Sequence, residues 1–105
     1  MITNNSTYKL IKDTATQLIP NCQVYLFGSR VNSNETKDSD YDLLIITPNN
    51  ISVQDKLLYK STLRKLFAKN KLDADLIIES KDEIKFKKNL IGHIVKYALN
   101  EGILL

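Results

Sequence analysis

Apolar residues recur at helical spacing in three parts of the chain, so the pattern predicts three main helices. The first is expected to begin after a cap at Asn5 or Ser6 and to end before Pro20. The second is expected over residues 52–69 and the third over residues 86–100, with Gly102 as a C-terminal cap. The residues expected to face the core are Ile11, Ala15, Leu18 and Ile19 in the first helix, Tyr59, Leu63, Leu66 and Phe67 in the second, and Ile91, Ile94, Val95 and Ala98 in the third.

Short apolar runs between these helices predict three strands, over residues 23–27, 40–47 and 72–79. The middle run is apolar at every position from Leu43 to Ile46, which indicates a strand covered on both faces. The polar residues 29–39 are expected to begin with a short helix. The expected fold class is therefore α/β or α+β, a small mixed sheet of three or more strands with helices packed on it. A length of 105 residues fits one domain, 1–105.

Composition narrows the protein class. The chain is 43% hydrophobic and 26% charged, as ordinary globular proteins are. No apolar run approaches the roughly 20 residues of a membrane span, and the first residues do not resemble a secretory signal, so no membrane partner is expected. The single cysteine, Cys22, cannot form an internal disulfide, which favours the cytoplasm, and one cysteine with one histidine excludes a zinc site of the usual kind.

The distribution of charge says more than the net charge of +3, which is too small to indicate a nucleic-acid partner. Six basic residues and no acidic residue lie between Lys56 and Lys71. Four acidic residues and one lysine lie between Glu35 and Asp42. A negative spot binds cations and a positive segment binds anions, so a metal-bound polyphosphate would satisfy both.

The strongest chemical signal is a pair of carboxylates at the start of the middle strand. Asp40 and Asp42 are two residues apart, so a strand would direct both side chains to one face, where like charges repel unless a cation lies between them. Oxygen ligands favour Mg²⁺ or Mn²⁺. Asp75, on the next strand, would supply a third carboxylate, and three such groups can hold two metal ions for phosphoryl transfer. Spacing alone does not choose between Asp75 and Asp73.

Gly28, Ser29 and Arg30 directly follow the first strand and suit a phosphate. Glycine allows a tight turn and a close approach of the backbone to a ligand. A helix beginning after it would direct free N–H groups at an anion, the serine adds a hydroxyl donor, and the arginine adds a permanent positive charge. This turn and the carboxylates together predict a site for a metal-bound polyphosphate.

These motifs resemble those of a known family. Phe-Gly-Ser-Arg at 27–30, followed by Asp-Ser-Asp-Tyr-Asp-Leu-Leu-Ile at 38–45, is similar to the nucleotidyltransferase superfamily related to DNA polymerase beta. Within it the chain resembles the minimal nucleotidyltransferase family, whose members place an Asp-x-Asp pair about a dozen residues after a Gly-Ser turn. The ending of the chain, residues 93–105, also resembles the family's final helix and its Glu-Gly-apolar close. The resemblance covers residues 10–105.

The resemblance implies the transfer of a nucleoside monophosphate from ATP or another nucleoside triphosphate. Carried over, Gly28 and Ser29 would hold the triphosphate, Asp40 and Asp42 would bind two Mg²⁺ ions, and Asp75 would be the third ligand and help deprotonate the acceptor hydroxyl. Many small members resemble antitoxins that adenylylate a tyrosine of a helical HEPN-domain toxin, so a HEPN partner is implied. The alternatives are an antitoxin that inhibits by binding alone and a transferase for a small molecule. The acceptor, the base and the oligomeric state stay open.

Other polar residues receive structural interpretations. Lys56, Lys60 and Arg64 form an i, i+4, i+8 row that is typical of a solvated helix face. His93 is expected to be an inert surface residue, and Cys22 a small core residue. Tyr25 and Tyr41 are expected to pack in the core.

Overall fold

The described elements follow one another as helix, strand, strand, helix, strand, helix, helix and strand. The computed structural model describes residues 2–28, 40–90 and 93–105. Within these residues the elements are, in order, α1 (Ile2–Leu18), β1 (Gln23–Phe27), β2 (Tyr41–Thr47), α2 (Val53–Lys69), β3 (Ala74–Ser80), α3 (Lys81–Lys87), α4 (Ile94–Glu101) and β4 (Ile103–Leu104).

The strands of the described part form one mixed sheet in the order β3-β2-β1-β4. The helix α2 joins β2 to β3, which is the kind of crossover that a parallel pair requires, and these two strands are parallel. β1 is antiparallel to both of its neighbours, β2 and β4. The predicted fold class, a mixed sheet of three or more strands with packed helices, is confirmed; the short strand β4 was not predicted.

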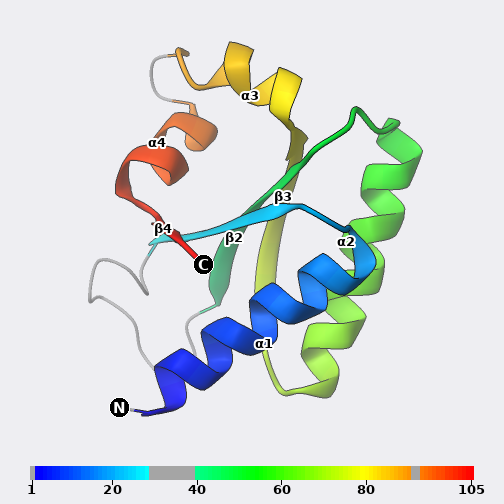
Figure 1. Cartoon of the computed structure of the whole chain (residues 1–105), viewed down its shortest axis with the longest axis vertical. Coiled ribbons are helices and arrows are strands. Elements are labelled where there is room, and N and C mark those ends of the chain that lie inside the picture. The colour runs from blue at the N-terminus through cyan, green and yellow to red at the C-terminus, as the bar shows by residue number, and fades with distance from the viewer. Residues whose placement is uncertain (1, 29–39, 91–92) are drawn as a thin grey trace.

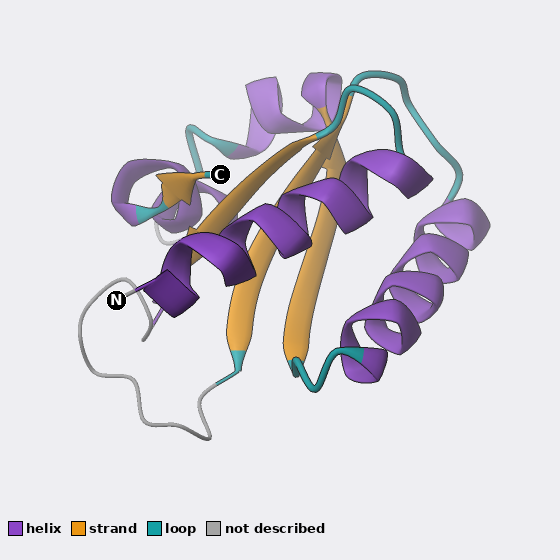
Figure 2. Cartoon of the chain, turned by 60° about the horizontal axis from the view of Figure 1, so that its bottom comes forward, coloured by secondary structure: helices purple, strands orange, loops and turns teal. Residues whose placement is uncertain are grey.

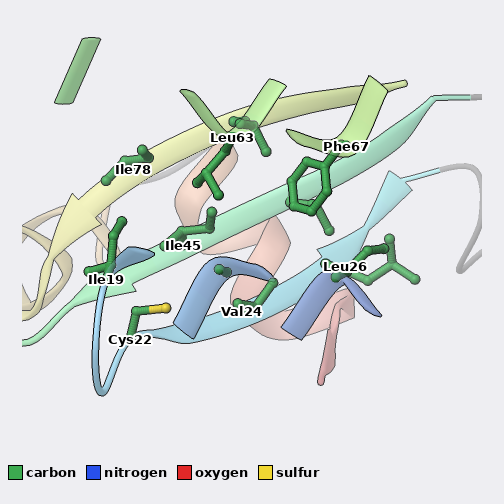
Figure 3. Close-up of a cluster of buried hydrophobic side chains, with 12 residues drawn as sticks. Ile19, Cys22, Val24, Leu26, Ile45, Leu63, Phe67 and Ile78 are labelled. Carbon is green, nitrogen blue, oxygen red and sulfur yellow. The ribbon is translucent and has the colours of Figure 1, made fainter. Parts of the chain in front are cut away.

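Helices cover the two faces of the sheet in pairs (Figures 1 and 2). α1 and α2 pack on one face, where the buried side chains of Leu43 and Ile45 meet Leu63 and Phe67 of α2 (Figure 3). α3 and α4 pack on the other face, where Leu44 and Ile46 meet α4. Burial of every residue from Leu43 to Ile46 confirms that β2 is covered on both sides. The expected core residue Cys22 is also buried.

Two predicted boundaries are wrong. α1 begins at Ile2, so Asn5 and Ser6 lie inside the helix and do not cap it. Both residue types are tolerated there, because each lowers helix stability by only a few tenths of a kcal/mol. The helix expected over residues 86–100 is shorter, because α4 covers only Ile94–Glu101, and the helix α3 (Lys81–Lys87), which lies mostly before that range, was not expected. Of its expected inward residues, Val95 and Ala98 are buried, whereas Ile94 is 49% exposed.

Side-chain caps explain where α3 and α4 begin. The Ser80 side chain accepts a hydrogen bond from the backbone of Glu83 at 3.2 Å, and the Glu83 side chain accepts one from the backbone of Ser80 at 2.9 Å, which starts α3 at Lys81. A second start lies at His93, whose Nδ1 accepts a hydrogen bond from the backbone of Val95 at 3.1 Å. His93 is therefore a helix cap rather than an inert surface residue. Ile91 and the short helix expected within residues 29–39 lie outside the described residues.

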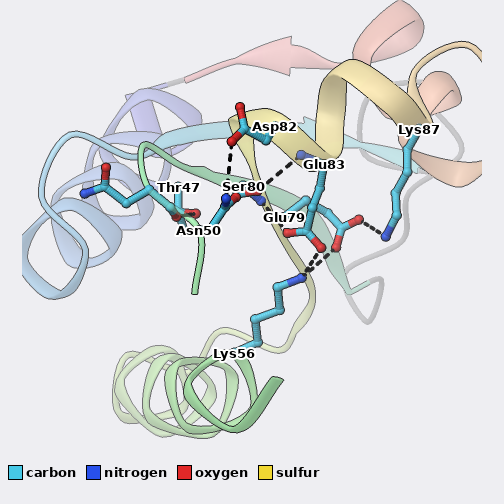
Figure 4. A network of polar contacts seen from close by, with 9 residues as sticks. Thr47, Asn50, Lys56, Glu79, Ser80, Asp82, Glu83 and Lys87 are labelled. Atoms are coloured by element: carbon cyan, nitrogen blue, oxygen red, sulfur yellow. Dashed lines mark hydrogen bonds and ion pairs between the residues drawn. The ribbon is translucent and has the colours of Figure 1, made fainter. Parts of the chain in front are cut away.

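An ion-pair network ties α2, β3 and α3 together at the C-terminal end of β3 (Figure 4). Lys56 donates to Glu79 at 3.2 Å and to Glu83 at 2.6 Å, and Lys87 also donates to Glu79. Burial alone would lower the pKa of Lys56, but the bonds to the two glutamates raise it on balance. Burial would likewise raise the pKa of Glu83, and its bonds to Lys56 and Ser80 lower it on balance. The interpretation of Lys56 as part of a solvated face is therefore wrong.

Across the described residues, the structure contains no helix that is long and apolar enough to cross a bilayer.

Candidate functional site

Two carboxylates meet where the parallel strands β2 and β3 begin. The register pairs Asp42 directly with Asp75. Side chains that are paired in a sheet lie on the same face, and for this pair it is the face that α3 and α4 cover, because Leu44 and Ile77 pack there. Asp40 lies just before β2 and is exposed. The sheet thus brings acidic groups of β2 and β3 together where the two strands begin.

The electrostatics of this edge are unfavourable without a cation. Burial raises the pKa of Asp42, and the nearby charges of Asp75 and Asp40 raise it further. All three causes act in the same direction, since each penalises the ionised carboxylate. A cation beside Asp42 would reverse the two charge effects.

Gly28 closes the site from the side of β1. It follows Phe27, which pairs with Asp42, and its backbone has a φ of 82°, a conformation that favours glycine. A Cβ atom at this position would lie 2.1 Å from Oδ2 of Asp42, well inside van der Waals contact. A larger residue here would strain the backbone and displace the Asp42 carboxylate, so glycine is favoured, and its backbone lies directly against the carboxylate.

The same sheet face carries an aromatic contact next to the carboxylates. The ring of Phe27 meets the ring of Tyr97 on α4 edge to face, with centroids 6.1 Å apart. Tyr97 is 40% exposed, and it lines a hollow of about 630 Å³ along α4 together with His93, Lys96 and Asn100. This contact fixes α4 over β1 and leaves the polar side of the helix accessible.

On the opposite side of Asp42, α2 contributes a basic group. Nη2 of Arg64 lies 3.9 Å from Oδ1 of Asp75, with the two side chains 56% and 63% exposed. Both residues line a second hollow of about 380 Å³, together with Asp40, Ala68, Leu72 and Asp73. The sequence predicts a solvated helix face at Arg64, and its side chain is indeed more than half exposed. The sequence gives no signal for its proximity to Asp75 beyond its place in the row with Lys56 and Lys60.

The donor set fits a hard divalent cation shared with a substrate. The described residues contain no group of three or more histidine, cysteine, aspartate or glutamate side chains placed to hold a metal ion by themselves. Mg²⁺ is usually held by one or two carboxylates together with substrate phosphates and water, rather than by a complete protein cage. The paired Asp42 and Asp75, whose mutual repulsion a cation would relieve, match that kind of site.

The predicted site residues differ in how far the structure describes them. Gly28, Asp42 and Asp75 are brought together, and Asp40 lies close enough to affect the pKa of Asp42. Ser29 and Arg30 fall outside the described residues. Asp73 precedes β3, where its backbone oxygen accepts a hydrogen bond from the backbone of Tyr41 at 2.9 Å, so the register favours Asp75 as the partner of Asp42. No sequence signal indicated that the ring of Tyr97 would contact Phe27 beside the carboxylates.

Known proteins share this fold. A candidate nucleotidyltransferase from Sulfolobus solfataricus is 21% identical, with a TM-score of 0.61 and coverage of 92% of this chain and 74% of that protein. A toxin-antitoxin structure with AMP-PNP is 20% identical, also with a TM-score of 0.61, and covers 95% of this chain and 69% of the matched one. A search of curated proteins gave no significant match. The family model described as polymerase beta, nucleotidyltransferase, matches residues 9–100. This chain therefore belongs to the polymerase beta nucleotidyltransferase family.

Proposed function

We propose that this protein is a metal-dependent nucleotidyltransferase of the minimal type, a single domain over residues 1–105. It transfers AMP from ATP to a hydroxyl group of a partner protein and acts as an antitoxin. The observation that carries the proposal is the pairing of Asp42 with Asp75 directly beside the backbone of Gly28. Members of the family generally use divalent metal ions. The likeness to a toxin-antitoxin structure with AMP-PNP supports both the nucleotide and the kind of partner.

Each residue of the site has a separate role in the proposed reaction. Asp42 and Asp75, with Asp40, would hold Mg²⁺ or Mn²⁺, and the metal supplies charge neutralisation at the reacting phosphate. The backbone at Gly28, with Ser29 and Arg30, would hold the triphosphate. The acceptor oxygen forms a bond to the α-phosphorus as the bond to the bridging oxygen breaks. Pyrophosphate leaves, and the hydroxyl proton passes to the carboxylate of Asp75. Such transfers depend mainly on positioning and on charge stabilisation.

The partner we propose is a HEPN-domain protein, modified on a tyrosine in the cytoplasm. The exposed carboxylates of Asp40 and Asp75 leave the acceptor side of the site open, so a second protein can complete it. The buried thiol of Cys22 is compatible with a reducing compartment. An antitoxin that acts by binding alone is the second candidate, which the toxin-antitoxin likeness supports equally.

The test mixes the protein with a HEPN-domain protein as the candidate partner, ATP labelled at the α-phosphate, and Mg²⁺. We expect label on the partner, and we expect Asp42→Asn to reduce the transfer rate by about a hundredfold or more. Asp13→Asn is the matched control, because Asp13 lies on the exposed side of α1 and forms an ion pair with the exposed Lys9, four residues earlier. It should transfer at the wild-type rate.

Two results would decide against catalysis. Absence of label with ATP and with the other nucleoside triphosphates would refute nucleotidyl transfer. An inactive Asp42→Asn protein that still neutralises the toxin fully would show that binding is sufficient and would favour the second candidate.

A further inference from the structure

We propose that the hollow between α2 and the start of β3 receives the acceptor, and that Arg64 is the residue that positions the acceptor and Asp75 there. This inference rests on the proposed nucleotidyl transfer, and it adds a subsite and a residue. The strand order, the Arg64–Asp75 contact and the composition of the hollow carry it.

The strand order indicates on which side of Asp42 the triphosphate and the acceptor bind. β2 lies between β1 and β3, so Asp42 has Gly28 on one side and Asp75 on the other. In phosphoryl transfer the attacking and leaving oxygens lie roughly in line, on opposite sides of the phosphorus. A triphosphate held at Gly28 places the departing pyrophosphate on the β1 side. The acceptor oxygen must then approach from the side of β3.

The structure is open at that side. β3 is one of the two edge strands of the sheet formed by the described residues, and α2 packs beside it (Figure 1). Between them lies the hollow of about 380 Å³ whose lining includes Asp40, Asp75 and Arg64. Two of the three carboxylates proposed to hold the metal, Asp40 and Asp75, thus line the hollow, and Arg64 lines it from α2.

The Arg64–Asp75 contact adds little to stability. Its atoms are 3.9 Å apart, and both side chains are more than half exposed. Exposed ion pairs of this kind contribute little to folding, because water and salt screen them. An arginine fork can orient a carboxylate and still donate N–H groups to an oxygen in the hollow. A positioning role explains its placement better than a structural role does.

The lining of the hollow indicates the class of acceptor. Ala68 and Leu72 provide apolar surface, and Asp40, Asp73 and Asp75 provide an acidic rim. An apolar side chain that ends in a hydroxyl, such as the phenol of tyrosine, matches this mixture. The acidic rim favours basic residues beside the acceptor tyrosine on the partner. A strongly anionic acceptor would be repelled.

The experiment measures transfer from labelled ATP and Mg²⁺ to the HEPN-domain protein, with the concentrations of ATP and of that protein varied separately. The variants are Arg64→Gln, Arg64→Lys and the control Lys65→Gln, which changes the adjacent exposed lysine of α2. We expect Arg64→Gln to lower kcat/KM for the acceptor about tenfold, because misplacement of reacting groups slows the step. The KM for ATP and the unfolding midpoint should stay unchanged, Arg64→Lys should recover part of the rate, and Lys65→Gln should match the wild type.

Several outcomes would overturn the inference. A wild-type rate in Arg64→Gln, an equal loss in Lys65→Gln, or an increase confined to the KM for ATP would each refute the acceptor subsite while leaving nucleotidyl transfer intact. Absence of transfer by the wild-type protein would refute the proposed function, and the acceptor subsite with it.

Discussion

The carboxylates at the two ends of β3 lie in opposite electrostatic environments. Near its C-terminal end, Glu79 has a side chain that is only 8% exposed, and the ammonium groups of Lys56 and Lys87 bind it from two helices. Near its N-terminal end, Asp75 is 63% exposed and lies beside Asp42, another carboxylate, with a guanidinium group 3.9 Å away. Both residues belong to the same strand, yet one end is neutralised within the protein and the other is not.

This difference separates a part of the molecule that maintains the fold from a part that is available to a ligand. Burial of a carboxylate is costly unless it is paired and hydrogen-bonded, and the network at Glu79 meets that condition. The repulsion at Asp42 persists because no residue of the network reaches it, and its pKa is raised as a consequence. Active sites commonly retain such unfavourable arrangements at the expense of stability. Substitutions at the two ends should therefore have opposite consequences.

The largest combined effect on transfer and stability is expected from Gly28→Ala, which alters the carboxylate end. The added Cβ atom would lie 2.1 Å from Oδ2 of Asp42 and would sit on a backbone with a φ of 82°. We expect about a hundredfold loss of transfer rate, as for the loss of a well-placed charge-stabilising group, and a loss of roughly 1–3 kcal/mol of stability.

Gly102→Ala is the control for Gly28→Ala. Its Cβ atom would meet the backbone oxygen of Ala98 at 2.2 Å and that of Leu26 at 2.9 Å, but no carboxylate. It should lose stability while the folded fraction, measured by circular dichroism, transfers at the normal rate. Wild-type transfer by Gly28→Ala would show that the close approach to Asp42 is unimportant.

The next effect concerns the neutralised end. Glu79→Gln removes the charge that Lys56 and Lys87 share and leaves their ammonium groups poorly compensated. We expect the free energy of unfolding in urea to fall by about 2 kcal/mol, with kcat/KM of the folded protein unchanged. Asp13→Asn, which alters only an exposed pair on α1, should cost no more than about 0.5 kcal/mol. An equal cost for both substitutions would remove the distinction between the two ends.

A smaller effect of opposite sign is expected for Asp42→Asn, which should raise the unfolding midpoint at pH 7. The folded-state pKa of Asp42 lies above the unfolded value of 3.8, so at pH 7 the ionised carboxylate destabilises the fold. As the pH falls through the folded pKa and then through 3.8, protonation removes that penalty. Thermal melts should therefore show an advantage at pH 7 that disappears near pH 3. A variant less stable than the wild type at pH 7 would contradict the repulsion.

The smallest effect is the acid sensitivity of the network. The pKa of Glu83 is lowered on balance in the folded state, so its contribution is present above the unfolded value of 4.5 and is lost as the pH falls through the folded pKa. Glu83→Gln should abolish this part of the acid destabilisation and leave the Asp42 effect intact. Thermal melts over the same pH range measure this loss of stability. If the melting temperature of Glu83→Gln falls with pH as steeply as that of the wild type, the ion pair with Lys56 contributes nothing.

Sequence patterns predicted the central elements well because their signals are local. The apolar run from Leu43 to Ile46 was sufficient to identify a strand buried on both faces, and Gly28 marked the end of β1. The prediction failed between residues 80 and 100, where side-chain caps at Ser80 and His93 start two short helices, whereas the apolar pattern predicted one helix over residues 86–100. Caps compete with periodicity over a single turn, and periodicity does not resolve them.

By itself, the sequence determined which groups are available: the carboxylates of Asp40, Asp42 and Asp75, which precede apolar runs, and the glycine turn, which follows one. Only the tertiary structure decided which of them meet. The parallel register of β2 and β3 set Asp42 opposite Asp75, and the packing of α2 brought Arg64 to Asp75 and Lys56 to Glu79. Strand register and helix packing depend on contacts between residues far apart in the chain, which local spacing does not encode.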